Sequence, residues 1–253
     1  MSHCIRMIPR LDIKSANVVK PVHTEALRIV GDPRALALRY FHEGADELFY
    51  ADIVASLYRR KLDVEQLKAV MEGIFIPVTV AGGLRSIQDI RDVLRAGADK
   101  VAINTYAVER PAFLQEAVQT FGAQCVMLFV EAKKRPDGRY EAFTDGGREP
   151  SGRDVVEWVQ QAIGYGVGEV LLTSIDQEGT RRGYEIDLIR QVAAVTPVPL
   201  IVHGGAGRPE TLTTAIREGG ADALAFSSVL HYRDYSIRRA KETLRAAQYS
   251  VRL

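Results

Sequence analysis

Short apolar runs rich in β-branched residues alternate along the chain with longer segments in which apolar positions recur at helical spacing. Glycines often separate the two kinds of segment. This alternation predicts repeated strand–helix units and therefore a parallel sheet. The expected strands are residues 5–13, 47–54, 74–81, 100–104, 124–132, 169–176, 198–203 and 221–227.

The segments between these runs carry helix signals. Residues 31–46 include Asp32, which is suited to an N-cap, and Pro33, which is suited to the first helical position. Gly44 marks the expected end of that helix. Residues 86–99 show the same arrangement, with a serine before the first apolar position and a glycine near the end.

Eight strand–helix units in 253 residues are the size of a (β/α)8 TIM barrel. An open doubly wound sheet is the alternative. A single domain, residues 1–253, is expected because no stretch has the composition of an interdomain linker. Residues 135–144 depart from the alternation, and Asp137-Gly138 within them predicts the turn of an added hairpin after the fifth strand.

The chain also repeats itself at half its length. Gly82-Gly83 and Gly204-Gly205 each follow an apolar run, and Gly83 and Gly205 are 122 residues apart. GADKVAIN and GADALAFS recur at nearly the same distance. This spacing predicts a two-fold internal repeat of half-barrels, about residues 1–122 and 123–253.

Charge and composition narrow the classes of function. The 33 basic and 32 acidic residues give a formal net charge of +1, without the basic block expected of a nucleic-acid-binding protein. No apolar run has the length of a membrane span or the context of a secretory signal, so a cytoplasmic protein is expected. The two cysteines form no metal-ligand pattern, and the glycine turns lack G-x-G-x-x-G spacing, so no metal or other cofactor is expected.

The glycine pairs are candidate phosphate sites. A strand that ends in two glycines leaves backbone N–H groups free, and the following helix adds its positive N-terminal end. A tight strand-to-helix turn is the alternative. Asn104-Thr105 and Ser227-Ser228 end the next strands. Because the third and seventh strands of a barrel lie on opposite sides, the pairs together predict a ligand phosphorylated at both ends.

Carboxyl groups are expected between these sites. Asp12 ends the first strand and Glu131 ends the fifth, on the opposite wall. Two facing carboxyl groups suit a general acid and a general base, although capping or ion pairing is the alternative for each. Lys20, Thr173 and Glu178 complete the polar rim, and Lys20 could equally be a solvated loop charge.

A charged ring is expected at the opposite end of the barrel. If Asp12 points inward, side-chain alternation also turns inward four charged residues at strand beginnings. Burying such a ring costs free energy unless its charges are paired. It is therefore expected to seal or gate the bottom of the barrel, and a purely structural ion-pair plug is the alternative. Its members are Arg6, Glu47, Lys100 and Glu169.

Several of these motifs together resemble one family, the cyclase subunit of imidazole glycerol phosphate synthase. The resemblance covers nearly the whole chain and implies a (β/α)8 barrel that uses ammonia in histidine biosynthesis. Its substrate would be phosphoribulosyl-formimino-aminoimidazole carboxamide ribonucleotide, and its products imidazole glycerol phosphate and aminoimidazole carboxamide ribotide. The resemblance rests on LDIKSANVVK, GDPRALALRYFHEGADEL, TVAGGLRS, RAGADKVAINTYAV, GGREPSG, LLTSIDQEGTRRGYEIDLI, HGGAG and SSVLHY.

The resemblance implies roles for individual residues. Asp12 and Glu131 would be the acid/base pair, and Lys20 would close over the substrate. The charged ring would admit ammonia from a glutaminase subunit docked at the barrel's bottom. Phosphate contacts would come from Gly83, Asn104 and Thr105 on one side and from Gly179, Gly205 and Ser228 on the other. Apart from the resemblance, positions at or near the strand ends predict further substrate contacts from Thr173, Glu178, His203 and Ser227.

Departures from the family pattern lie in the pocket. Glu131 and Glu178 stand where the family has aspartates, and Pro21 replaces a loop glycine. Larger residues, Arg10, Phe129 and His203, stand where the family has small ones. One hypothesis is that Arg10 pairs with Glu131 and suppresses the cyclase chemistry.

These departures keep other readings open. One is a paralogue that passes ammonia from its own glutaminase to another amidation, such as that of a surface-polysaccharide sugar. A second, from a different class, is a non-catalytic ammonia conduit. The sister isomerase of the same pathway is also a two-phosphate barrel, but LLTSIDQEGT and SSVLHY fit the cyclase better.

Overall fold

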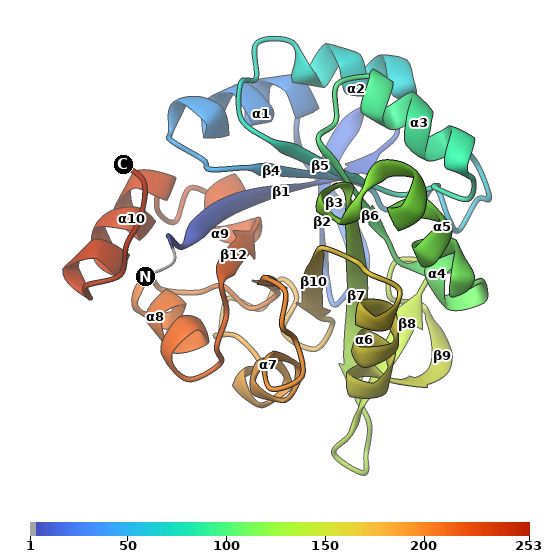
Figure 1. The fold of residues 1–253 in the computed structure, drawn as a ribbon. Helices are drawn as coiled ribbons and strands as arrows, with labels where there is room; N and C mark the ends of the chain where they lie inside the picture. Colours follow the sequence, from blue (N-terminus) through green and yellow to red (C-terminus); the bar gives the residue numbers. More distant parts are fainter. Residues whose placement is uncertain (1–3) are drawn as a thin grey trace.

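A closed parallel barrel forms the body of the molecule in the computed structural model, which describes residues 4–253. Neighbouring strands pair in parallel, and the β7–β10 and β1–β12 pairings complete the ring (Figure 1). Closure confirms the predicted (β/α)8 barrel and excludes the open sheet. Its strands are β1 (Arg6–Lys14), β4 (Leu48–Asp52), β5 (Val78–Ala81), β6 (Lys100–Ile103), β7 (Val126–Lys134), β10 (Glu169–Ser174), β11 (Leu200–His203) and β12 (Ala223–Phe226).

Helices surround the barrel (Figure 1). The predicted N-caps are present, because the Asp32 and Ser86 side chains accept hydrogen bonds from Ala35 N at 2.8 Å and Asp89 N at 3.1 Å. The helices are α1 (Pro33–His42), α2 (Val64–Met71), α3 (Ile87–Arg95), α4 (Thr105–Glu109), α5 (Ala112–Phe121), α6 (Val155–Gly164), α7 (Ile186–Ala193), α8 (Glu210–Arg217), α9 (Ser228–His231) and α10 (Ile237–Ala246), with a 3₁₀ turn, η1, at Ala123–Cys125.

Two antiparallel additions extend the sheet above the barrel. The predicted hairpin after the fifth strand is found as β7 with β8 (Tyr140–Thr144), and β9 (Glu149–Asp154) continues it. A second hairpin, β2 (Asn17–Val22) with β3 (Glu25–Gly31), pairs with β1. Lys20 lies on β2, so the expectation that it belongs to a loop was wrong.

The inside of the barrel is packed with side chains rather than open. Inward positions form a buried cluster that is separate from the larger core between barrel and helices. This interior layer lies between the charged ring below and the strand ends above. Its larger members are Ile8, Phe49, Met127, Phe129, Leu171 and Ile201.

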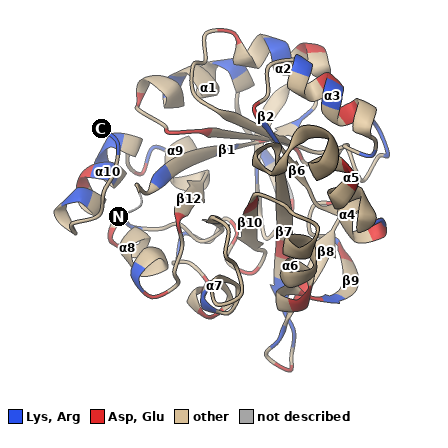
Figure 2. Ribbon diagram, viewed as in Figure 1, with Lys and Arg blue, Asp and Glu red and all other residues tan. Residues whose placement is uncertain are grey.

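The outer surface mixes both signs of charge. Helices α2 and α3 carry acidic and basic residues beside one another (Figure 2), in keeping with the nearly balanced composition. Within residues 4–253, no helix combines the length and the apolar character that crossing a membrane would need.

Candidate active site

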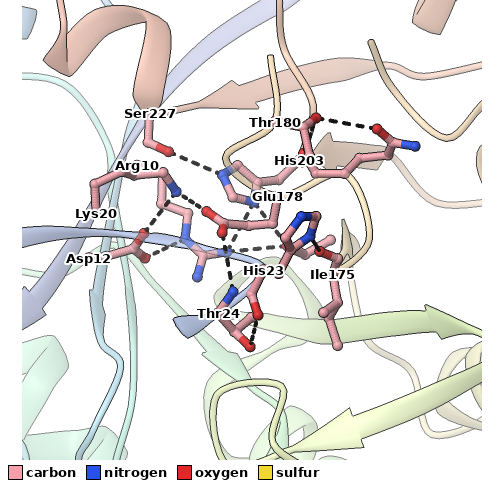
Figure 3. Close-up of polar contacts among 12 residues, drawn as sticks. Arg10, Asp12, Lys20, His23, Thr24, Ile175, Glu178, Thr180, His203 and Ser227 are labelled. Atoms are coloured by element: carbon pink, nitrogen blue, oxygen red, sulfur yellow. Dashed lines mark hydrogen bonds and ion pairs between the residues drawn. The ribbon is translucent and has the colours of Figure 1, made fainter. Parts of the chain in front are cut away.

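Asp12 lies at the centre of a buried ion-pair network at the upper end of β1 (Figure 3). Arg10 Nε donates to Asp12 Oδ1 at 2.7 Å, and Lys20 Nζ lies 3.7 Å from Asp12 Oδ2. Lys20 also forms an ion pair with Glu178. Burial alone would raise the pKa of Asp12, but the charges of Arg10 and Lys20 outweigh it and hold this pKa below its usual range. Asp12 is therefore a carboxylate at neutral pH.

Glu131 occupies the opposite wall, at the upper end of β7. Its carboxyl group is buried and accepts a hydrogen bond from Asn104 Nδ2 at 2.9 Å. Burial raises the pKa of Glu131 to about 7, against the lowering influence of the Arg10 charge. The two buried carboxyl groups that the sequence places across the barrel thus differ in protonation near neutral pH.

The predicted pairing of Arg10 with Glu131 is not what the structure shows. Arg10 bonds Asp12, two residues along the same strand, and no ion pair joins it to Glu131 in the described part of the chain. Its Nη1 donates to Thr173 Oγ1 at 3.2 Å. Arg10 therefore acts on Glu131 only through its electrostatic field. The direct partner of Arg10 is Asp12, the other proposed acid/base residue.

His203 continues this network across the barrel. Its Nδ1 lies 3.4 Å from Arg10 Nη1 and 3.3 Å from Thr173 Oγ1, and its Nε2 lies 3.4 Å from Ser227 Oγ. Burial, with the Arg10 charge, lowers the pKa of His203 well below its usual value. A neutral imidazole therefore links Arg10 to the strand end at Ser227.

Two separate cavities contain the predicted phosphate residues. The first, about 110 Å³, is lined by Gly83, Asn104 and Thr105 together with Glu131 and Arg10. The second, about 10 Å³, has room for about one water molecule. Its lining includes Gly179, His203, Gly205, Ser227 and Ser228.

The side chains of Arg10 and His203 separate these cavities. Arg10 lines the first cavity, His203 lines the second, and the two side chains meet at 3.4 Å. The two glycine turns are tight, since Gly83 and Gly205 have φ of 70° and 95°. The residues predicted to bind the two phosphates thus line two cavities, with a side-chain barrier between them.

The charged ring is present at the lower end of the barrel. Arg6 Nη1 contacts Glu47 at 2.6 Å and Glu169 at 2.8 Å. Lys100 Nζ contacts the same two carboxylates at 3.2 and 2.8 Å. Each cation thus bridges both anions, which provides the pairing that the sequence argument requires.

Comparisons with known proteins agree with this geometry. Residues 6–236 match the family described as histidine biosynthesis protein. The chain is 50% identical over 206 residues to imidazole glycerol phosphate synthase subunit HisF of Legionella pneumophila, covering 81% of this chain and 97% of that protein. It is 45% identical to the HisF subunit of Corynebacterium diphtheriae over the full length of both.

The chain belongs to the HisF family. HisF is a subunit of the synthase, so members of this family work as parts of a complex. Membership makes this barrel a lyase-type enzyme of histidine biosynthesis and confirms the resemblance seen in the sequence motifs.

Within this HisF barrel, sequence analysis missed Asp52 in the first cavity. Asp52 ends β4 as Asp12 lies near the end of β1, so its position at a strand end was the available signal. Its carboxylate pairs with Arg60 at 2.7 Å, and burial raises its pKa. Glu178, predicted to contact substrate, forms an ion pair with Lys20 in this structure, and its contact with substrate stays a prediction.

Proposed function

We propose that this chain is the cyclase subunit of imidazole glycerol phosphate synthase. It would use ammonia to convert phosphoribulosyl-formimino-aminoimidazole carboxamide ribonucleotide to imidazole glycerol phosphate and aminoimidazole carboxamide ribotide. The observation that carries this proposal is that two buried carboxyl groups, Asp12 and Glu131, face each other across the barrel with pKa values shifted in opposite directions. Family membership supplies the substrate class.

The two carboxyl groups divide the proton transfers. Addition of ammonia to the ketone of the ribulosyl group requires a proton to leave the nitrogen and a proton to reach the carbonyl oxygen. Asp12, held ionised by Arg10 and Lys20, is the base in this scheme. Glu131, with a pKa of about 7, is the acid because about half of the molecules still carry this proton at neutral pH.

The substrate's two phosphates would occupy the two glycine turns. The first turn has Gly83, with Thr105 of the next strand end in the same cavity, and the second has Gly205, with Ser228 beside it in the lining. A bisphosphate that spans them must displace the contact between Arg10 and His203. We therefore expect a side-chain rearrangement on substrate binding, with the hairpin β2–β3 moving as Lys20 changes partners.

Ammonia would come from a glutaminase subunit docked at the lower end of the barrel. The ring of Arg6, Glu47, Lys100 and Glu169 lies at that end, below the apolar interior. An uncharged molecule such as ammonia can cross an apolar interior at less cost than an ion can. The ring is therefore the proposed gate, and the interior the proposed path.

Turnover of the bisphosphate with excess ammonium salt tests this function without a partner. We expect turnover in the unmodified chain and a loss of about 10²-fold or more in Asp12→Asn, which cannot act as a base. Asp187→Asn, at an exposed position on α7, is the matched control and should keep full activity. Absence of turnover in the unmodified chain under ammonium saturation would contradict the proposal.

Arg10 and His203 favour a second candidate in the same fold. They fill the interior where the family pattern has small residues, which would suit an ammonia-delivering relative with a different acceptor. Tight binding of the bisphosphate without turnover would support that candidate. Neither binding nor turnover would point to the non-catalytic conduit.

A further inference from the structure

The Arg10 guanidinium has one edge that the protein does not use. Its side chain is 5% exposed, its Nε bonds Asp12, and its Nη1 bonds Thr173. No bond to Nη2 is formed by any residue from 4 to 253. Arg10 nevertheless lines the first cavity. A charged donor that lines the cavity and has no protein acceptor is free to bond an acceptor from a ligand.

Aromatic rings hold that edge in place. The Arg10 Cζ lies 5.6 Å from the Phe49 ring centroid and 5.1 Å from the Phe129 centroid. The two rings meet edge to face, with centroids 5.8 Å apart. Stacking of this kind favours the cation and fixes its plane. The donor is thus preorganised on the inner wall of the cavity and is not a mobile surface charge.

The neighbours of Arg10 in the described part of the chain bond its other nitrogens and leave Nη2 without a partner on the cavity side. Asp12 is shared between Arg10 and Lys20, and Lys20 is shared with Glu178, so these four groups balance one another. His203 is neutral. A negative group entering from the cavity would therefore meet the free edge of Arg10. Two carboxyl groups share this lining: Asp52, which is paired with Arg60, and Glu131, whose pKa is raised to about 7.

The outer part of the same cavity suits a phosphate. Gly82-Gly83, after β5, and Thr105, after β6, line it. Both glycines have positive φ, 104° and 70°, which turns the backbone sharply before α3 begins. The lining of a single cavity of about 110 Å³ therefore contains both an anion-binding turn and the Arg10 side chain.

We propose that the first cavity binds small phosphorylated carboxylic acids, with the phosphate at Gly82-Gly83 and the carboxylate on Arg10 Nη2. This site does not depend on the second cavity or on displacement of His203. Such acids occupy half of the site used by the bisphosphate and therefore compete with it. A carboxylate matches the planar guanidinium edge better than a hydroxyl group does, because the bond is then assisted by charge on both sides.

Calorimetric titration of the intact chain tests the site with defined probes. The acids are 2-phosphoglycolate, 3-phosphoglycerate and 4-phosphoerythronate, which differ in length, and glycerol 3-phosphate is the control with a phosphate but no carboxylate. We expect at least one acid to bind about tenfold or more tightly than the control. The preferred length reports the separation of the two ends of the cavity.

Two variants test whether Arg10 causes the preference for ligands that carry a carboxylate. Arg10→Met keeps side-chain length without charge, and it should bind the acids and glycerol 3-phosphate equally. Thr105→Val should weaken both kinds of ligand together, because it changes the phosphate end. Thermal unfolding shows whether each variant is folded. If Arg10→Met does not fold, the comparison of acids with glycerol 3-phosphate in the unmodified chain still decides.

Two results would overturn the proposal: no acid preferred in the unmodified chain, or a preference that persists in folded Arg10→Met. These titrations contain neither ammonia nor the bisphosphate. Failure of the cyclase function would therefore leave their outcome unchanged, and failure of this site would leave ammonium-dependent turnover unchanged.

Discussion

Asp12 and Glu131 show how position changes the chemistry of one functional group. Both carboxyl groups are buried, and burial raises the pKa of each. Asp12 has two cations in contact, Arg10 and Lys20, which reverse the effect. Glu131 has the more distant Arg10 charge and hydrogen bonds from the Asn104 amide and the Gly147 backbone to oppose burial, but no ion pair with any described residue. The number of adjacent cations therefore decides which group keeps a proton.

This difference predicts the pH dependence of turnover. If Glu131 is the acid, activity should fall as pH rises through about 7, where its proton is lost. Glu131→Gln, which has no such proton to donate, should lower turnover by about 10²-fold and remove this limb of the profile. Glu149→Gln, at an exposed position on β9, is the control. A profile that is flat between pH 6 and 8 in the unmodified chain would contradict the role.

The same shift predicts a change in stability with a definite sign. The folded chain holds the Glu131 proton up to about pH 7, while the unfolded chain releases it near its usual value of 4.5. Between these values the folded state binds more protons, so its stability falls as pH rises. Urea unfolding at pH 5 and pH 7 should show this fall, and it should be smaller in Glu131→Gln. An equal slope in both proteins would count against the raised pKa.

Residue positions were predictable from the sequence, whereas residue partners were not. Strand alternation correctly places Arg10 and Asp12 on the same inner face of β1. It cannot tell whether Arg10 reaches along its own strand to Asp12 or across to Glu131. That choice depends on the rings of Phe49 and Phe129, which flank the guanidinium. Three-dimensional packing therefore decides the pairing.

Among the elements, the hairpin β2–β3 is what sequence reasoning missed. Its turn is made by His23 and Thr24, which have φ of 51° and 66°. Turns of this geometry usually carry glycine or asparagine, and the hairpin at Asp137-Gly138 was predicted for that reason. Tertiary contacts hold the unusual turn, since His23 N donates to the Glu178 carbonyl at 3.1 Å. No local pattern reveals such a contact.

We expect the Glu178 carboxylate to stabilise the docking of this hairpin on the barrel. Its carboxylate pairs with Lys20 and lies 3.4 Å from Thr24 N. Glu178→Gln leaves the buried Lys20 with Asp12 as its remaining partner, and breaking such a pair costs about 3 kcal/mol. We expect that loss in urea unfolding, together with faster tryptic cleavage after Arg28.

Glu25→Gln is the control, because Glu25 lies in the same hairpin and is exposed. It should change neither stability nor cleavage. Unchanged stability in Glu178→Gln would show that the hairpin is held by its backbone bonds to β1 and not by the ion pair.

At the scale of the whole molecule, the barrel was predictable because its signals are repeated. Eight apolar runs, each followed by a helical segment, admit few arrangements other than closure. The internal two-fold repeat of half-barrels stays a prediction. The barrier between the cavities was not predictable, because it depends on contact between Arg10 of β1 and His203 of β11, which are far apart in sequence.

A substitution in the charged ring should lower turnover with ammonia from glutamine but not turnover with free ammonium. It lies at the end of the barrel opposite Asp12 and Glu131, and Lys100 bridges Glu47 and Glu169 within it. Lys100→Met leaves these carboxylates with Arg6 as their remaining partner in the ring and alters the proposed entrance. We expect glutamine-supported turnover, measured with the glutaminase partner, to fall about tenfold. Turnover of the isolated chain with excess ammonium should stay within about twofold, since ammonia can then enter from the substrate side.

Lys68→Met is the matched control, because Lys68 is an exposed lysine of α2 that pairs locally with Glu65. It should leave both activities unchanged. An equal fall of both activities in Lys100→Met would show that the ring supports the fold and not the passage of ammonia. If neither activity falls, ammonia reaches Asp12 by a route that bypasses the ring, and the barrel interior then serves packing alone.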